Sequence, residues 1–155
     1  MAKVDFIRSQ NGYNFFYNLD AAVGTGCPNR RDDVLLVQYF LQATNRTERK
    51  IGDITARYPI DGVWNNNWDG ILGRFQDDLV LWGPKKWSDR SIDPVPGFLG
   101  NHQIYGPIHH NNYKILTLNI NYLEQRKSDF PRIADAHDCP LELRSLIRVR
   151  WLGHS

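Results

Sequence analysis

The feature that most restricts the fold is a stripe of large apolar residues in the middle of the chain. They recur at i, i+3, i+4, i+7, i+11 and i+14, and they are Trp68, Ile71, Leu72, Phe75, Leu79 and Trp82. This spacing predicts an amphipathic helix that buries one face, and Gly83-Pro84 marks its end. Gly70 and Gly73 interrupt the helix at a cost of about 1 kcal/mol each relative to alanine. We expect both glycines to permit the close approach of another helix.

A second helix is predicted upstream, from about Arg30 to Gln42. Its apolar positions recur at helical spacing and comprise Val34, Leu36, Val37, Phe40 and Leu41. Asn29 is the expected N-cap of this helix, and Asp32, three residues on, completes an arrangement like a capping box. A turn at Asp61-Gly62, where glycine allows a positive φ angle, then leads towards the central helix.

The two ends of the chain add further elements. Residues 4–17 are rich in aromatic side chains and contain Asn11-Gly12, which predicts a short β-hairpin. Further helices are predicted over residues 112–127 and from Pro140 onward. We therefore expect a single mainly α domain over residues 1–155, a helical bundle with an N-terminal aromatic hairpin or loop and extra C-terminal helices.

Charge and hydropathy exclude several classes of function. The formal net charge is +2, and the one basic cluster, which we expect to be a solvated helix face rather than a nucleic-acid-binding surface, comprises Arg132, Arg144, Arg148 and Arg150. The N-terminus has no apolar stretch typical of a Sec signal peptide, and no segment reaches the roughly 20 apolar residues that span a bilayer. We expect a protein that is cytoplasmic as synthesised, without nucleic-acid or membrane partners. Export would then need a specialised secretion system, or incorporation in a phage or injection particle.

Cysteine and histidine usage gives no sign of a metal centre. The two cysteines, Cys27 and Cys139, are an even count that permits a disulfide, but they do not make a disulfide framework. We expect two free thiols. The histidines away from the helices lack the spacing of a zinc motif, and they are His102, His109, His110 and His137. No metal and no cofactor are expected.

Two segments in order resemble the peptidoglycan-binding domain family. The first is Asp33-Val34-Leu35-Leu36-Val37-Gln38-Tyr39-Phe40-Leu41, and the second is Asp61-Gly62 followed at the family's distance by Ile71-Leu72 and Phe75-Gln76. The match covers about Val23 to Val80. It implies a small three-helix module that contributes affinity for cell-wall glycan and peptide. Residues 23–80 would then be a peptidoglycan-binding-like core, elaborated by residues 1–22 and 81–155.

The sequence departs from the family at the turn before the central helix. The family's Gly-Pro-x-Thr is replaced by Asn65-Asn66-Asn67-Trp68, and its usual alanine by Ile71. Saccharide binding uses amide and carboxylate hydrogen bonds together with an aromatic face. The predicted ligand-binding residues are therefore Asp61, Gly62, Trp64, Asn65, Asn66, Asn67 and Trp68. The structural alternative is that Asn67 caps the central helix and Trp68 fills the core.

No catalytic signature accompanies this turn. The sequence has no Gly-x-Ser-x-Gly and no P-loop, and no catalytic residues are assigned. Gln38 and Gln76 are expected to play structural roles through hydrogen bonds within the fold. The expected function is a non-catalytic cell-wall binding module. The alternative is a protein–protein adaptor, or a structural component of a secretion or contractile injection system or a phage particle. The partner is peptidoglycan or another protein, and the oligomeric state stays open.

Overall fold

The computed structural model describes residues 3–6, 8–9, 15–43, 58–80, 91–94, 103–104, 114–126 and 132–153. Within these residues the chain is mainly helical, as predicted. The helices are α1 (Arg31–Ala43), α3 (Asn66–Val80), α4 (Lys114–Gln125), α5 (Leu141–Gly153) and the short 3-10 helix η2 (Ile133–Asp135). None of the described helices is both long enough and apolar enough to cross a membrane.

Short strands pair in three places. β1 (Lys3–Phe6) runs antiparallel to β3 (Phe15–Asn18), with Lys3 opposite Asn18 and Phe6 opposite Phe15. This confirms the predicted N-terminal hairpin, although its expected turn at Asn11-Gly12 lies outside the described residues. The other pairs are β4 (Val23–Gly24) with β5 (Ser91–Ile92), and β2 (Arg8–Ser9) with β6 (Gln103–Ile104).

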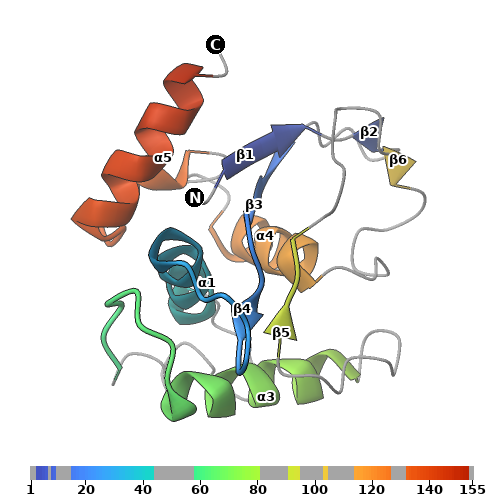
Figure 1. Ribbon diagram of the computed structural model, residues 1–155. Coiled ribbons are helices and arrows are strands. Elements are labelled where there is room, and N and C mark those ends of the chain that lie inside the picture. The colour runs from blue at the N-terminus through green and yellow to red at the C-terminus, as the bar shows by residue number, and fades with distance from the viewer. Residues whose placement is uncertain are drawn as a thin grey trace.

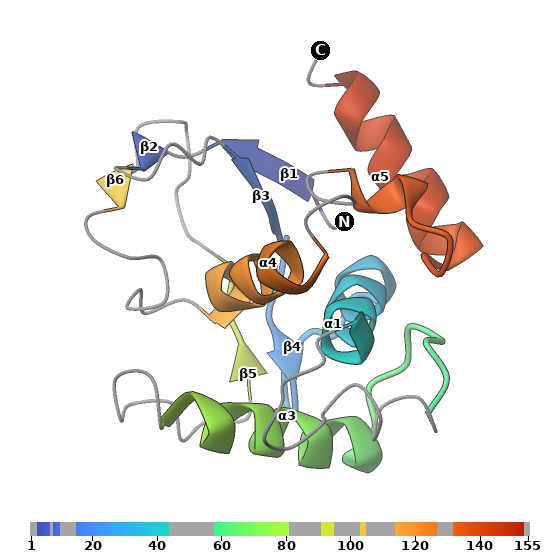
Figure 2. The same cartoon turned by 180° about the vertical axis from the view of Figure 1, so that it is seen from behind.

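Helix α1 is the centre of the molecule. It contacts α3, α4, α5 and β4, and in Figures 1 and 2 it lies with α4 between α3 on one side and α5 on the other. Residues 33–41 are all buried. A helix enclosed in this way buries its whole circumference rather than one stripe. The polar residues Asp33 and Gln38 on α1 therefore need partners inside the protein.

The two helices expected to pack on each other share one core. Val37 of α1 and Phe75 of α3 belong to the same cluster of buried side chains. The cluster also contains Tyr17 from the N-terminal hairpin and Ile115 and Ile147 from the C-terminal helices. The N-terminal hairpin and the C-terminal helices therefore contribute to the same core as α1 and α3.

The loop before α1 differs from the expected capping box. Asn29 adopts a left-handed φ of 49°. Its side chain accepts a hydrogen bond from the Gly24 N–H at 2.8 Å and donates one to the Gly24 carbonyl at 2.8 Å. The carbonyl of Arg30 accepts the first helical hydrogen bond, from the Val34 N–H. Asn29 therefore closes the loop, and the prediction that it caps α1 is wrong.

The acidic residue that holds the start of α1 is Asp33. Its carboxylate accepts hydrogen bonds from the backbone N–H groups of Asp20 and Ala21, both at 3.1 Å. Burial raises the pKa of Asp33, and the two backbone donors offset part of that rise. The first residue of the Asp-Val motif thus ties the chain after β3 to α1.

Candidate functional site

Gln38, on the buried helix α1, holds the turn at Asp61-Gly62 through three hydrogen bonds. The Gly62 N–H donates to Gln38 Oε1 at 2.9 Å, and Gln38 Nε2 donates to the Val63 carbonyl at 3.0 Å and to Asp61 Oδ1 at 3.3 Å. Gln38 is fully buried. Its hydrogen bond with the Gly62 N–H is buried, and those with Asp61 and the Val63 carbonyl are partly buried. The predicted structural role of Gln38 is confirmed, and its partner is the backbone of the turn.

Arg31, at the start of α1, also binds the backbone of this turn. Its Nη1 donates to the Asp61 carbonyl at 2.6 Å, while Nε and Nη2 donate to the two oxygens of Glu142, both at 2.7 Å. The hydrogen bond from Arg31 lowers the pKa of Glu142. Gly62 has a φ of 76°, and a Cβ there would lie 2.7 Å from Arg31 Cγ. Both the backbone conformation and the packing against Arg31 require glycine at this position.

The start of α3 is capped by Asn65. Its Oδ1 accepts a hydrogen bond from the Trp68 N–H at 3.2 Å, and its carbonyl accepts the Asp69 N–H at 3.0 Å. Asn65, rather than Asn67, is therefore the N-cap, which corrects the structural alternative from the sequence. Asn66 and Asn67 are exposed in the first turn, and within the described part of the chain their side-chain amides make no hydrogen bond.

Asp69 fixes the aromatic part of the turn. Its Oδ1 accepts a hydrogen bond from Trp64 Nε1 at 2.6 Å, and its Oδ2 accepts one from the Thr25 hydroxyl. Trp64 is half-buried and lies against the fully buried Trp68, with ring centroids 6.4 Å apart and planes tilted by 31°. The indole of Trp64 is thus held in one orientation, and the loop that carries Thr25 is tied to the turn.

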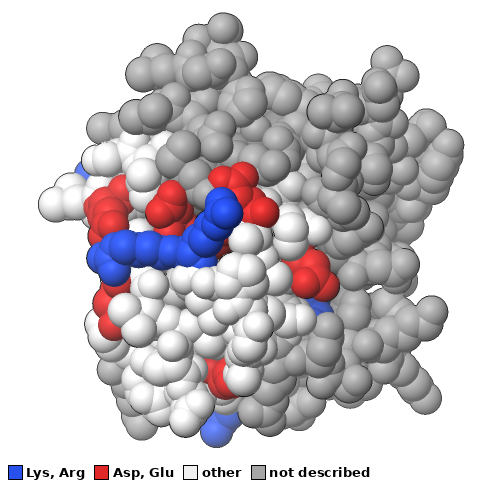
Figure 3. Space-filling view, viewed as in Figure 1, with Lys and Arg blue, Asp and Glu red and all other residues white. Residues whose placement is uncertain are grey.

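The seven predicted site residues lie together but do not all face solvent. Asn65, Asn66 and Asn67 are exposed, and Asp61 and Trp64 are half-buried. Gly62 and Trp68 are buried, so they shape the surface without lining it, which corrects the expectation for those two residues. Figure 3 shows charges of both signs gathered in a band near α1, whereas the described surface over β4 and the first turns of α3 is mostly uncharged.

Sequence reasoning missed the part of this surface contributed by the loop before α1. Thr25 and Gly26 are exposed. The hydrogen bond from Thr25 to Asp69, which is 44 positions away in the sequence, places both residues beside the turn. Asp69 directly follows the predicted site residues in the sequence and is an acidic residue in the first turn of α3, where the helix dipole favours negative charge, but neither feature indicates Thr25 as its partner. We name the exposed and half-buried residues of both segments the turn surface: Thr25, Gly26, Asp61, Val63, Trp64, Asn65, Asn66 and Asn67.

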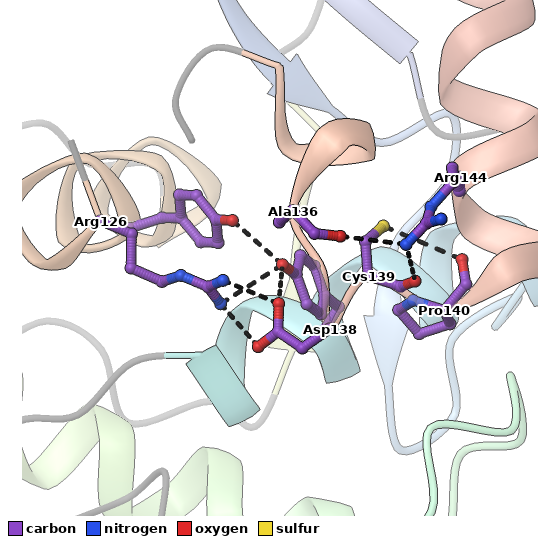
Figure 4. Close-up of polar contacts among 8 residues, drawn as sticks. Arg126, Ala136, Asp138, Cys139, Pro140 and Arg144 are labelled. Atoms are coloured by element: carbon purple, nitrogen blue, oxygen red, sulfur yellow. Dashed lines mark hydrogen bonds and ion pairs between the residues drawn. The ribbon is translucent and has the colours of Figure 1, made fainter. Parts of the chain in front are cut away.

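A second polar cluster lies on another side of α1 (Figure 4). The Tyr39 hydroxyl donates to Asp138 Oδ1 at 2.9 Å and lies 3.0 Å from the Tyr122 hydroxyl, and Arg126 donates to both oxygens of Asp138 at 2.7 Å. The guanidinium of Arg126 also lies 5.1 Å from the centre of the Tyr122 ring. Burial raises the pKa of Tyr39, which keeps its hydroxyl protonated. We name these four residues the tyrosine–arginine cluster.

Cys139 follows Asp138 of this cluster, and its buried position makes its thiol poorly reactive. Burial raises the pKa of its thiol to about 11. Arg144 Nη2 donates to the carbonyls of Ala136 and Cys139 at 3.0 and 3.1 Å, which orders the chain before α5. Cys27 is half-buried, and both cysteines are free thiols, as predicted.

Histidine and carboxylate groups do not converge on a metal site in the part of the chain that the structure describes. No group of three His, Cys, Asp or Glu side chains there is arranged to hold a metal ion. His137 is exposed, while His102, His109 and His110 lie outside the described residues.

Comparisons with known proteins add no family or structural relative. No family model matches the chain, and no curated protein or solved structure gives a significant match. The resemblance to peptidoglycan-binding domains rests on the two helix motifs and stays a prediction.

Proposed function

We propose that this protein is a non-catalytic binding protein whose turn surface binds the glycan of bacterial peptidoglycan. The observation that carries the proposal is the pair of exposed amides of Asn66 and Asn67, which make no hydrogen bond to any residue that the structure describes and lie in the same turn as the fixed indole of Trp64. Amides donate and accept hydrogen bonds to hydroxyl and acetamido groups. An indole offers an apolar surface for the C–H groups of a sugar ring.

The frame beneath the turn surface supports binding because it is already ordered. Gln38 and Arg31 hold the backbone of the turn, and Asp69 holds Trp64. Side chains that are fixed before binding lose less conformational entropy when the ligand arrives. A mostly uncharged surface also suits the sugar backbone better than a charged one. The combination favours a preformed saccharide surface over a flexible loop.

Sedimentation with purified sacculi tests the proposal. We expect the wild-type protein to pellet with sacculi at physiological salt, with an apparent Kd in the micromolar range. The double variant Asn66→Ala/Asn67→Ala should lose at least tenfold in affinity while its unfolding midpoint stays unchanged. Gln125→Ala is the matched control, because it removes an exposed amide from α4. Wild-type protein that stays in the supernatant would reject the proposal.

The non-catalytic part of the proposal has its own test. A muramidase needs two carboxyl groups placed across a sugar-binding cleft. The carboxylate closest to the exposed amides in sequence, Asp69, instead has both oxygens occupied by Trp64 and Thr25. We expect no clearing of cell-wall substrate in a zymogram. A clearing band from pure protein would show that the chain is a hydrolase.

A protein–protein adaptor is the second candidate, and one observation favours it. Among the described residues, the two large apolar side chains with high exposure are Val63 at 54% and Leu141 at 75%. Both flank the Arg31–Glu142 ion pair, since Val63 follows the Asp61-Gly62 turn and Leu141 precedes Glu142. Arginine is enriched at protein interfaces, and exposed apolar side chains beside it would gain from burial against a partner. A secretion or phage component would use such a surface.

One variant separates the two candidates. Leu141→Asp places a charge on the apolar position that lies outside the turn surface, and it leaves the exposed asparagines and Val63 intact. A glycan binder should keep most of its affinity for sacculi in this variant. An adaptor should lose a stoichiometric partner seen in native co-purification, while Asn66→Ala/Asn67→Ala should keep it.

A further inference from the structure

Gly70 is a glycine that the fold itself does not need. It lies in the interior of α3 and is exposed, and a Cβ built there would meet no heavy atom within 4 Å. Its backbone is helical, so no left-handed conformation requires glycine. The expectation that Gly70 lets another helix approach closely is therefore wrong. In a helix interior glycine is less favourable than every other residue except proline, so alanine would stabilise this position.

The neighbours of Gly70 place it within reach of the turn surface. Residues four apart lie on the same face of a helix, and Asn66, Gly70 and Arg74 follow that spacing. All three are exposed, and so is Asn67. The absence of a side chain at Gly70 leaves a gap in the outer row of α3, between the amides of the first turn and the side chain of Arg74.

We propose that Gly70 determines specificity by letting the bound saccharide chain lie directly on the backbone of α3. This inference rests on the proposed function and names the path of its ligand. The sugar next to the one bound by Asn66 and Asn67 crosses the helix at Gly70, where glycine allows the closest approach of a ligand to the main chain. Any Cβ at this position would hold that sugar away from the helix.

The substitution Gly70→Ala tests the inference because it moves stability and binding in opposite directions. Alanine removes the helix penalty of glycine without a clash, so the Tm should rise by about 2–4 °C. Affinity for purified sacculi in the sedimentation assay should fall at least tenfold. Gly70→Gln should weaken binding further, because its side chain fills more of the gap. Gln125→Ala, at the exposed C-terminal end of α4, is the control and should leave binding unchanged.

Each other outcome overturns the inference in an identifiable way. If Gly70→Ala raises the Tm and binds sacculi as well as the wild type, Gly70 has no role in ligand approach, and the proposed function stands. If Gly70→Ala lowers the Tm, the glycine has a structural role and the inference fails. If the wild-type protein does not bind sacculi, the proposed function and this inference both fall.

Discussion

Two neighbouring residues of α1, Gln38 and Tyr39, lead to two polar regions of different character. Consecutive residues of a helix point about 100° apart, and these two are both fully buried. Gln38 reaches the backbone of the Asp61-Gly62 turn, and Tyr39 reaches Asp138 of the tyrosine–arginine cluster. One helix therefore organises both regions. Among the residues that the structure describes, exposed amides without a hydrogen bond lie at the turn surface and not in the tyrosine–arginine cluster.

The difference separates a structural network from a candidate binding surface. In the tyrosine–arginine cluster, Arg126 and Asp138 satisfy each other and join α4 to the chain before α5. At the turn surface the inner polar groups are hydrogen-bonded, whereas the outer amides of Asn66 and Asn67 have no hydrogen-bond partner among the described residues. Exposed groups that keep hydrogen-bonding capacity beside an ordered frame are the ones available to a ligand.

The largest expected effect tests whether Gln38 holds the turn. Gln38→Leu should lower the free energy of unfolding by about 3 kcal/mol, because the Gly62 N–H and the Val63 carbonyl lose their partner at roughly 1–3 kcal/mol each. Urea denaturation followed by tryptophan fluorescence measures it. Gln42→Leu is the matched control on the same helix and should change stability little. A loss below about 1 kcal/mol for Gln38→Leu would mean that the turn does not depend on this residue.

A pair of glycines isolates the contact between the turn and Arg31. Gly26 and Gly62 have nearly the same φ, 75° and 76°, but only at Gly62 would a Cβ meet Arg31 Cγ, at 2.7 Å. Alanine in the left-handed region costs roughly 1–2 kcal/mol by itself. Gly62→Ala should therefore destabilise the protein by about 1 kcal/mol more than Gly26→Ala. Equal losses in urea denaturation would show that Arg31 yields without cost.

The tyrosine–arginine cluster should affect stability and leave binding unchanged. Asp138→Asn should lower the free energy of unfolding by about 1 kcal/mol at pH 7, a modest value because the Asp138 side chain is 41% exposed and water screens its ion pair. Sacculus binding should match that of the wild type. A loss of binding without a loss of stability would place this cluster, rather than the turn surface, at the ligand.

The same variant has a defined dependence on pH. Burial works to raise the pKa of Asp138, but hydrogen bonds from Arg126 and Tyr39 prevail and hold it below its usual value. A carboxyl with a lowered folded pKa stabilises the protein above the unfolded value, about 3.9, and loses that contribution as the pH falls through the folded pKa. The stability difference between wild type and Asp138→Asn should therefore shrink below about pH 4. A difference that stays constant down to pH 2 would contradict the ion pair.

The smallest effect concerns the two thiols, whose alkylation rates report how accessible each region is to a reagent in solvent. Because burial raises the pKa of Cys139 to about 11, only about one thousandth of it is thiolate at pH 8. Cys27, half-buried in the loop near Thr25, should react with iodoacetamide at least tenfold faster in the native protein. Mass spectrometry of partly alkylated protein measures the ratio. Equal rates would show that the chain before α5 opens readily.

Much of the helical framework could be predicted from local patterns. The apolar spacing predicted α1 and α3 to within a residue or two at their N-terminal ends, and the aromatic run predicted the hairpin of β1 and β3. These features depend on residues close in sequence. The complete burial of α1 was harder to foresee, because Asp33 and Gln38 appear as polar positions until their distant partners are known.

The sequence predicted where the candidate site lies, but not which hydrogen bonds hold it together. Three consecutive asparagines offer three possible caps, and only the backbone geometry selects Asn65 over Asn67. The hydrogen bond from Thr25 to Asp69 joins residues 44 positions apart, and no local pattern indicates such a pairing. The misplaced role of Gly70 has the same origin, because sequence cannot tell an exposed glycine from one that is packed.

A titration of ¹⁵N-labelled protein with soluble peptidoglycan glycan strands tests the turn surface most directly. The side-chain amides of Asn66 and Asn67 and the indole N–H of Trp64 each carry a ¹⁵N–H group that reports on this surface. We predict saturable shifts of these signals and of the Gly70 backbone N–H, with no shift of Arg126 in the tyrosine–arginine cluster. Shifts confined to that cluster, or no shifts at millimolar glycan, would contradict the proposal that the turn surface binds the cell wall.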